Sequence, residues 1–385
     1  MKKIFVLLFL VVLVVSGCGE RNLAVTDSQT TAPFIDVTTP LETVVDDELL
    51  SNYFSVQTTR EFDVVEGEFG YVAVALIEHM NDHLPNRLAF SDRELESAEW
   101  IVETLLEMGF DESQIEMQNF NVDTQTSSWW GEAYWMVDWF KDAGYYDEVE
   151  FTGYSQNVIL TLPGRSTETI IIGAHYDGMA NEGMSDNAGG TVLLLENAYR
   201  MRQVDHYYTL QYVFFGAEEV GLIGSFYFSD QMQVSDIDNL ILMINADVII
   251  DGPDLIYAIG YTEPSLSQTI EILWDGPEIR QNELTMQVKN IAARLNAENN
   301  LDLISKPHAL FLPSDQLAFV SLGIPLMVFY ATHPVEYPQV MIGDVLHTPD
   351  DNLDFLIQNH PGRVERALHD FGLFLEAIVS SENLQ

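Results

Sequence analysis

Histidine and carboxylate side chains recur in five short segments of this 385-residue chain. The segments are His175-Tyr176-Asp177, Asp186-Asn187, Glu218-Glu219, Asn245-Ala246-Asp247 and His347-Thr348. Imidazole and carboxylate groups are the side chains with which proteins commonly bind zinc. Two histidines and three carboxylates would suffice for two zinc ions, with one carboxylate shared between them. The residue types therefore predict a site for two zinc ions.

Each of these residues also has a simpler explanation when taken alone. Asp186 could cap a helix, and a lone histidine such as His347 is most often an exposed loop residue. Glu218 and Glu219, however, come soon after the apolar run Tyr212–Phe215. A carboxylate at the end of a buried strand needs a partner or a metal. The combination therefore favours a metal site over unrelated surface charges.

Strands and helices of an α/β fold would bring these segments together. Apolar runs predict buried strands at Val158–Leu162, Ile170–Ala174, Leu210–Phe215, Leu240–Asn245 and Leu326–Tyr330. Helical spacing of apolar residues predicts helices at Tyr71–Met80, Ser91–Gly109, Asn187–Arg202, Gly221–Met232 and Leu353–Ser380. This alternation predicts a three-layer α/β/α fold, with a mostly parallel sheet covered by helices on both faces. Ligand sites in such sheets lie at the carboxyl ends of strands, where His175, Glu218 and Asp247 fall.

The five segments together resemble the di-zinc aminopeptidase and glutamate carboxypeptidase family of co-catalytic zinc metallopeptidases (clan MH). This family includes bacterial leucyl aminopeptidases, and the resemblance implies a zinc exopeptidase fold of the phosphorylase/hydrolase-like kind. Its pattern is His-x-Asp, Asp-Asn-Ala-Ser-Gly, Glu-Glu-x-Gly-Leu-x-Gly-Ser, an aspartate after a strand, and His-Thr-x-x-Asp. The matching positions here are His175–Asp177, Asp186–Gly190, Glu218–Ser225, Asp247 and His347–Asp351. Gln316 stands where the family commonly has a histidine.

The resemblance implies a metal-binding role for five residues. One Zn²⁺ would be held by His175 and Asp247. The second would be held by Glu219 and His347, with Asp186 bridging the two Zn²⁺ ions. The family also tends to have a cis peptide bond after the bridging aspartate.

Two further residues would be catalytic according to the same resemblance. Asp177 would not bind metal itself but would orient the imidazole of His175, which does. Glu218 would be the general base, taking a proton from the metal-activated water and returning it to the leaving amine. The implied activity is hydrolysis of peptide bonds at peptide ends.

The first 18 residues have the features of an export signal. Lys2 and Lys3 precede the apolar run Ile4–Val15, and Val15-Ser16-Gly17-Cys18 resembles the lipobox of bacterial lipoproteins. Cys18, the only cysteine, would carry the lipid. Residues 19–66 are polar and acidic and predict a flexible tether, and residues 67–385 would form the catalytic domain. We therefore expect an exported protein of the cell envelope, anchored to the membrane by lipid.

The composition excludes one class of partner and marks one unusual segment. With a net charge of −44 and only 16 basic residues, the chain lacks the positive surface that a nucleic acid requires. Residues 124–150 hold four of the six tryptophans. This aromatic insert is either a small satellite core, or a lid over the substrate, or a contact with a membrane or partner.

Several functions share this residue pattern. We favour an aminopeptidase because arginine, which suits the terminal carboxylate that a carboxypeptidase must hold, is scarce between the first and last ligands. The arginines there are Arg200, Arg202, Arg280 and Arg294. A glutaminyl cyclase-type acyltransferase with a single zinc, and a non-enzymatic binding domain, are the alternatives. The complete set of ligands with a base argues against the binding domain.

Overall fold

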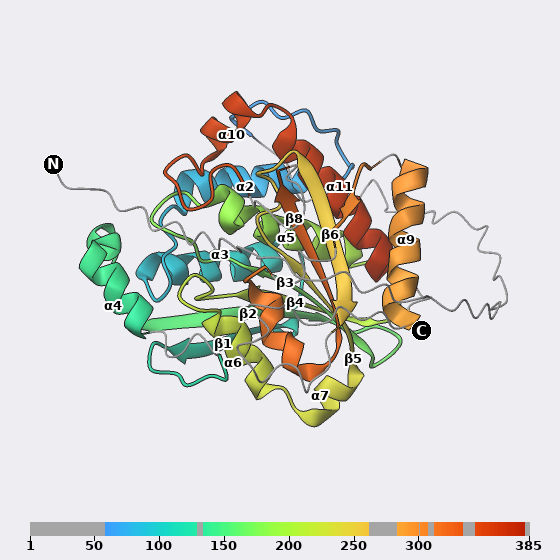
Figure 1. The fold of residues 1–385 in the computed structure, drawn as a ribbon, viewed down its shortest axis with the longest axis horizontal. Helices are drawn as coiled ribbons and strands as arrows, with labels where there is room; N and C mark the ends of the chain where they lie inside the picture. Colours follow the sequence, from blue (N-terminus) through green and yellow to red (C-terminus); the bar gives the residue numbers. More distant parts are fainter. Residues whose placement is uncertain are drawn as a thin grey trace, which may run out of the picture.

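The computed structural model describes residues 58–128, 134–261, 283–299, 301–306, 312–333 and 343–381. The predicted signal segment with Cys18, and most of the predicted tether, lie outside these residues. The described residues form an eight-stranded sheet with helices on both of its faces (Figure 1). The predicted three-layer α/β/α fold is thus confirmed. Within the described ranges, no helix has the length and apolar character that crossing a bilayer requires.

The sheet is parallel at its centre and antiparallel towards its edges. The strands are β1 Ile115–Asn121, β2 Tyr154–Leu162, β3 Thr169–His175, β4 Thr209–Phe215, β5 Leu240–Ala246, β6 Asp254–Tyr261, β7 Ile304–Ser305 and β8 Pro325–Thr332. Their order is β1-β2-β4-β3-β5-β8-β6-β7. Strands β4, β3, β5 and β8 run parallel to one another, while β2 and β6 flank them in the opposite direction. All five predicted strands are present.

Helices cover both faces of this sheet. They are α2 Tyr71–His83, α3 Asp92–Glu107, α4 Tyr134–Ala143, α5 Gly189–Met201, α6 Ile223–Gln231, α7 Val234–Asn239, α9 Glu283–Asn299, α10 Leu353–Asn359 and α11 Arg363–Val379. Two further helical segments, the π-helical turn η3 Met184–Ala188 and the 3-10 helix η6 Asp315–Leu322, lie near the carboxyl ends of the parallel strands. Side chains alternate between the faces because successive residues of a strand point in opposite directions. Ile170 and Ile172 of β3 therefore belong to one core, and Ile171 belongs to the other.

Two predicted helices differ from the structure. The single helix expected over Leu353–Ser380 is two helices, because Pro361 cannot continue a helix and Gly362 adopts a left-handed conformation (φ 76°). The helix expected from Asn187 begins at Gly189, after the distorted turn η3. The apolar pattern also did not predict β1, β6, β7 or α9. The sequence of β1 (IEMQNFN) is polar because this strand lies at an edge of the sheet.

The aromatic insert packs as a satellite core where the structure describes it. Val137 and Phe140 of α4 are buried against Phe90 and Phe120. Trp139, on the opposite side of the helix, is 47% exposed. In Figure 1, α4 stands at one edge of the molecule. Trp129 and Trp130 lie outside the described residues, and the packing of the rest supports the satellite-core interpretation.

Candidate metal centre

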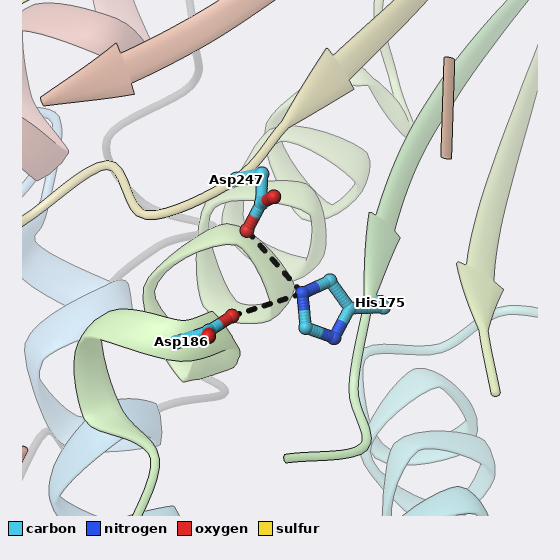
Figure 2. A group of neighbouring side chains, drawn as sticks. All are labelled: His175, Asp186 and Asp247. Carbon is cyan, nitrogen blue, oxygen red and sulfur yellow. Dashed lines mark hydrogen bonds and ion pairs between the residues drawn. The ribbon is translucent and has the colours of Figure 1, made fainter. Parts of the chain in front are cut away.

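Three neighbouring parallel strands deliver candidate ligands to one edge of the sheet. Strand β3 ends at His175, between β4 and β5. Glu218 and Glu219 follow the end of β4, and Asp247 follows the end of β5. Because the carboxyl ends of parallel strands meet at one edge, these side chains converge. Figure 2 shows His175 and Asp247 reaching from two strand ends towards Asp186.

The first group of potential ligands surrounds the imidazole of His175. Its Nε2 lies 3.1 Å from Asp186 Oδ1 and 3.3 Å from Asp247 Oδ1 (Figure 2). The His175 side chain is 1% exposed. These three residues are close enough to hold one metal ion together.

The second group surrounds the imidazole of His347. Its Nε2 lies 2.9 Å from Asp186 Oδ2 and 3.2 Å from Glu219 Oε2. The two oxygens of Asp186 thus face different histidines, which is the arrangement required of a bridging ligand. His347 is 46% exposed, so this side of the centre is open to solvent. The structure therefore brings together all five residues for which a metal-binding role was predicted.

The charges of the centre fit a bound cation. Burial by itself would lower the pKa of His175, but nearby carboxylates, with Glu218 foremost, raise it well above its usual range. Burial and then the Asp186 carboxylate raise the pKa of Glu219 to about 7. Glu219 Oε1 is buried without a hydrogen-bond partner, which is costly unless a cation satisfies it. Imidazole and carboxylate donors suit zinc, so the residues present fit that metal.

Asp177 connects the first histidine to the backbone of the two glutamates. Its carboxylate, which is fully buried, accepts hydrogen bonds from Glu218 N (3.0 Å) and Glu219 N (3.2 Å). His175 Nδ1 lies 3.4 Å from Asp177 Oδ1 and 3.2 Å from the Asp177 carbonyl oxygen. This position lets Asp177 orient both the imidazole and the segment that carries the glutamates.

Glu218 belongs to neither ligand group. Burial raises the pKa of its carboxyl well above the usual range, an effect to which the Glu219, Asp315 and Asp247 carboxylates add. A glutamate beside the ligands with a raised pKa is suited to accept and return a proton near neutral pH.

Asp351 and Arg87 position the segment between the first histidine and Asp186. Asp351 accepts hydrogen bonds from Ser185 N (2.6 Å) and Asp186 N (3.1 Å). The peptide bond from Asp186 to Asn187 is cis, as the family resemblance implied. The buried Arg87 guanidinium donates to three carbonyl oxygens of this segment, at Tyr176, Glu182 and Gly183 (2.6–2.7 Å).

Glu94 has a role that sequence reasoning missed. Ser91 Oγ accepts a hydrogen bond from Glu94 N, as a helix cap should (3.2 Å). The Glu94 carboxylate, however, does not return to Ser91. It accepts hydrogen bonds from Phe90 N (2.6 Å), Ser155 Oγ (2.7 Å) and Ala217 N (2.8 Å). Glu94 therefore holds the residue that directly precedes Glu218.

Sequence patterns marked only one of these three positioning residues as part of the site, and they did not show its role. Asp351 is the aspartate of the His-Thr-x-x-Asp motif, whereas Arg87 is an isolated arginine. Glu94 lies three residues after Ser91, a spacing typical of a helix capping box, but its carboxylate bonds elsewhere. Their roles depend on contacts with segments far away in the sequence.

Comparison with known proteins agrees with this geometry. The sequence profile described as "Peptidase family M28" matches residues 157–372, which is more than half of the chain. The alkaline phosphatase isozyme conversion protein of Escherichia coli is 24% identical over 323 residues, covering 76% of this chain and 84% of that protein. A probable lipoprotein aminopeptidase of Mycobacterium tuberculosis is 32% identical over 98 residues, covering 25% of this chain and 20% of its own length.

Solved structures show the same fold at low sequence identity. A zinc aminopeptidase from Bacillus subtilis has a TM-score of 0.60 at 16% identity, covering 84% of this chain and 97% of that chain. A glutaminyl cyclase from Porphyromonas gingivalis has a TM-score of 0.55 at 16% identity, covering 81% and 99% respectively.

Proposed function

This chain belongs to peptidase family M28, and on that premise we propose that it is a two-zinc aminopeptidase. It is a metallopeptidase, and the fold and the family support exopeptidase-like activity. The observation that carries the proposal is the position of Asp186. One of its oxygens faces His175 and the other faces His347, with Glu218 beside them and outside both ligand groups.

Two Zn²⁺ ions would be held by the two groups of residues that share Asp186. When bound, zinc would supply a water that ionises near neutral pH and would polarise the scissile carbonyl. Asp177 keeps His175 and the glutamate backbone in position through the contacts described above. The open side at His347 is where substrate would approach.

Glu218 would perform the proton transfers. One of its carboxylate oxygens accepts the proton that the attacking water loses. The same carboxyl then donates this proton to the nitrogen of the leaving amine, so that the C–N bond breaks without releasing an unstable amide anion. The raised pKa of Glu218 favours this return step, because the protonated carboxyl persists to a higher pH.

The contacts of the arginines support cleavage at the N-terminus of the substrate, because a carboxypeptidase would need an arginine for the terminal carboxylate. Arg200 donates to Glu376 (2.8 Å), and Arg202 donates to the Met108 carbonyl oxygen. Arg294 lies 4.0 Å from Glu298 of its own helix, and Arg280 is outside the described residues. Arg200 and Arg202 are thus hydrogen-bonded to groups outside the metal centre, and Arg294 lies nearest to a carboxylate of its own helix α9. A centre rich in carboxylates instead suits a substrate α-ammonium group.

The test compares one peptide in three forms: free, N-acetylated and C-amidated. We expect purified protein to cleave the free and amidated forms and to leave the acetylated form intact, because acetylation removes the positive α-amine. Product sequencing by mass spectrometry should show loss of N-terminal residues. Cleavage of the acetylated form but not of the amidated form would identify a carboxypeptidase.

A glutaminyl cyclase activity is the second candidate, because solved glutaminyl cyclases share the fold. The two complete ligand groups that share Asp186 favour the peptidase. A peptide with N-terminal glutamine distinguishes the two activities. A cyclase releases ammonia and leaves the peptide about 17 Da lighter, whereas an aminopeptidase releases free glutamine.

A further inference from the structure

A third group of metal-type side chains lies outside the metal centre. It comprises Asp251, Asp344 and His360, whose potential ligand atoms all lie within 4.8 Å of one another. His333 Nε2 contacts Asp344 Oδ1 and brings a second imidazole to the group. We call these four residues the α10–α11 cluster, because His360 lies between those two helices.

Asp251 is the feature of the cluster that points to a ligand. Its side chain is fully buried, and its Oδ2 accepts hydrogen bonds from Asp344 N and Val345 N. Its Oδ1 is buried and accepts no hydrogen bond. The nearest positive group to Oδ1 is Arg363 Nη1, at 3.7 Å, which is too far for a hydrogen bond. A buried carboxylate oxygen without a partner is costly, and a cation would satisfy it.

The two imidazoles add donors suited to a transition metal. His360 Nε2 lies 3.4 Å from Asp344 Oδ2. Burial, followed by the nearby Arg363, lowers the pKa of His360. His333 Nε2, which contacts Asp344 Oδ1, is buried as well. Two imidazoles and two carboxylates are a common donor set for zinc.

Arg363 is the competing occupant. Its Nη1 lies 2.9 Å from Asp344 Oδ2, and its side chain is 18% exposed. One guanidinium facing two carboxylates leaves one negative charge uncompensated. It also leaves Asp251 Oδ1 without a hydrogen bond. Because Arg363 borders solvent, its side chain can move aside when a smaller, more highly charged cation binds.

We propose that the α10–α11 cluster binds a divalent transition-metal ion, with zinc the best match to its donors. This site is separate from the metal centre but connected to it by short stretches of chain. Asp251 lies four residues beyond Asp247, and Asp344 lies three residues before His347. A bound ion therefore ties together the two segments that present one ligand of each zinc of the proposed centre.

The experiment measures zinc binding to the full chain by equilibrium dialysis and calorimetric titration. The metal-free protein is compared with His360→Ala and with His369→Ala. His369 is the matched control, because it also pairs with an aspartate (Asp370, 2.9 Å) but belongs to α11 outside the cluster. We expect His360→Ala to lose one equivalent of bound zinc and His369→Ala to lose none.

Two further variants separate this inference from the proposed function. In an Asp186→Asn background, which removes the proposed bridging ligand, His360→Ala should still reduce bound zinc by one equivalent per chain. Arg363→Gln should tighten binding at the same site, because the competing cation is gone; a misfolded variant could not produce this gain. If zinc binding is the same with and without His360 in both backgrounds, the cluster is an ion-pair network and the inference is wrong. Wild-type protein that binds zinc only through His360, with no further zinc lost in Asp186→Asn, would instead overturn the proposed function.

Discussion

Two adjacent glutamates have different roles in this protein because their surroundings differ. Glu219 is buried beside His347 and keeps one oxygen without a partner. Glu218 stands outside both ligand groups. Asp177 binds the backbone N–H of both residues, and Glu94 binds the preceding one. The direction of each side chain therefore depends on a backbone held by buried carboxylates, and not on the glutamates themselves.

Replacing Glu218 tests this division of roles. We expect Glu218→Gln to lower kcat by about 10²–10⁴, because an amide cannot accept and return the proton. Its metal content should stay that of the wild type, since Glu218 is not a proposed ligand. The matched variant Glu219→Gln should lose metal as well as activity. The measurements are steady-state kinetics and metal analysis; near-normal kcat in Glu218→Gln would refute the assignment of the base.

Helix α5 begins just after Asp186, the proposed bridging ligand, and carries a buried glutamate that anchors it to α2. The Glu196 carboxylate accepts hydrogen bonds from Gly70 N and Ala73 N (both 2.9 Å), so it caps the N-terminus of α2. Burial raises its pKa from 4.5 to about 7, even though Arg200 lies close by. In the folded protein this carboxyl therefore holds its proton at pH values where it would be ionised in the unfolded chain.

This pKa predicts how stability changes with pH. Between about pH 4.5 and 7 the folded state binds more protons than the unfolded state, so stability falls as pH rises. Glu196→Gln removes this dependence, worth up to about 3 kcal/mol for a shift of this size. We expect the difference between the Tm of the variant and the Tm of the wild type to shift in favour of the variant as pH rises from 5 to 8. The exposed Glu99→Gln on α3 is the control; a difference in Tm that is independent of pH would contradict the prediction.

Helix α4 tests the interpretation of the aromatic insert. Phe140 is 4% exposed within the satellite core, whereas Trp139 beside it is 47% exposed. We expect Phe140→Ala to lower stability by about 3–5 kcal/mol, as for other buried phenylalanines. Trp139→Ala should cost much less. Both should leave KM nearly unchanged, as measured with small and large apolar substrates. A raised KM for large substrates at unchanged Tm would instead identify a lid.

The whole molecule carries a net charge of −44, and its proposed catalytic centre is lined by carboxylates. A negative field of this kind attracts cationic peptide N-termini and repels nucleic acids. It also opposes compaction through self-repulsion, which salt screens. The sign of the charge thus agrees with the proposed substrate polarity.

We also propose that the molecule is exported and held at a membrane by lipid on Cys18. A related protein of Mycobacterium tuberculosis is a probable lipoprotein aminopeptidase, which supports this proposal. Expression with labelled fatty acid should label the wild-type chain, and Cys18→Ser should abolish the label. Because the chain has no other cysteine, no other thiol can substitute. Equal labelling of both proteins, or of neither, would count against the anchor.

The local sequence was sufficient to predict the central strands and the residues that gather at their ends. A buried parallel strand is a short apolar run, and a ligand at its carboxyl end directly follows that run. His175, Glu218 and Asp247 could therefore be found without a structure, and the family resemblance added their expected roles. The first helix and its Ser91-capped successor were also predicted, because capping and helical periodicity are local properties.

Only the tertiary structure showed which residues support the metal centre. Glu94 and Ala217 are 123 positions apart, yet a single hydrogen bond between them holds the glutamate segment. Arg87 reaches a loop about 90 positions away, and Asp251 meets His360 only because α10 and α11 separate at Pro361. Such contacts depend on how helices pack against the sheet, and not on any repeat along the chain. Periodicity identifies which faces of the elements are buried, whereas the partners of a buried charge are decided by the packed fold.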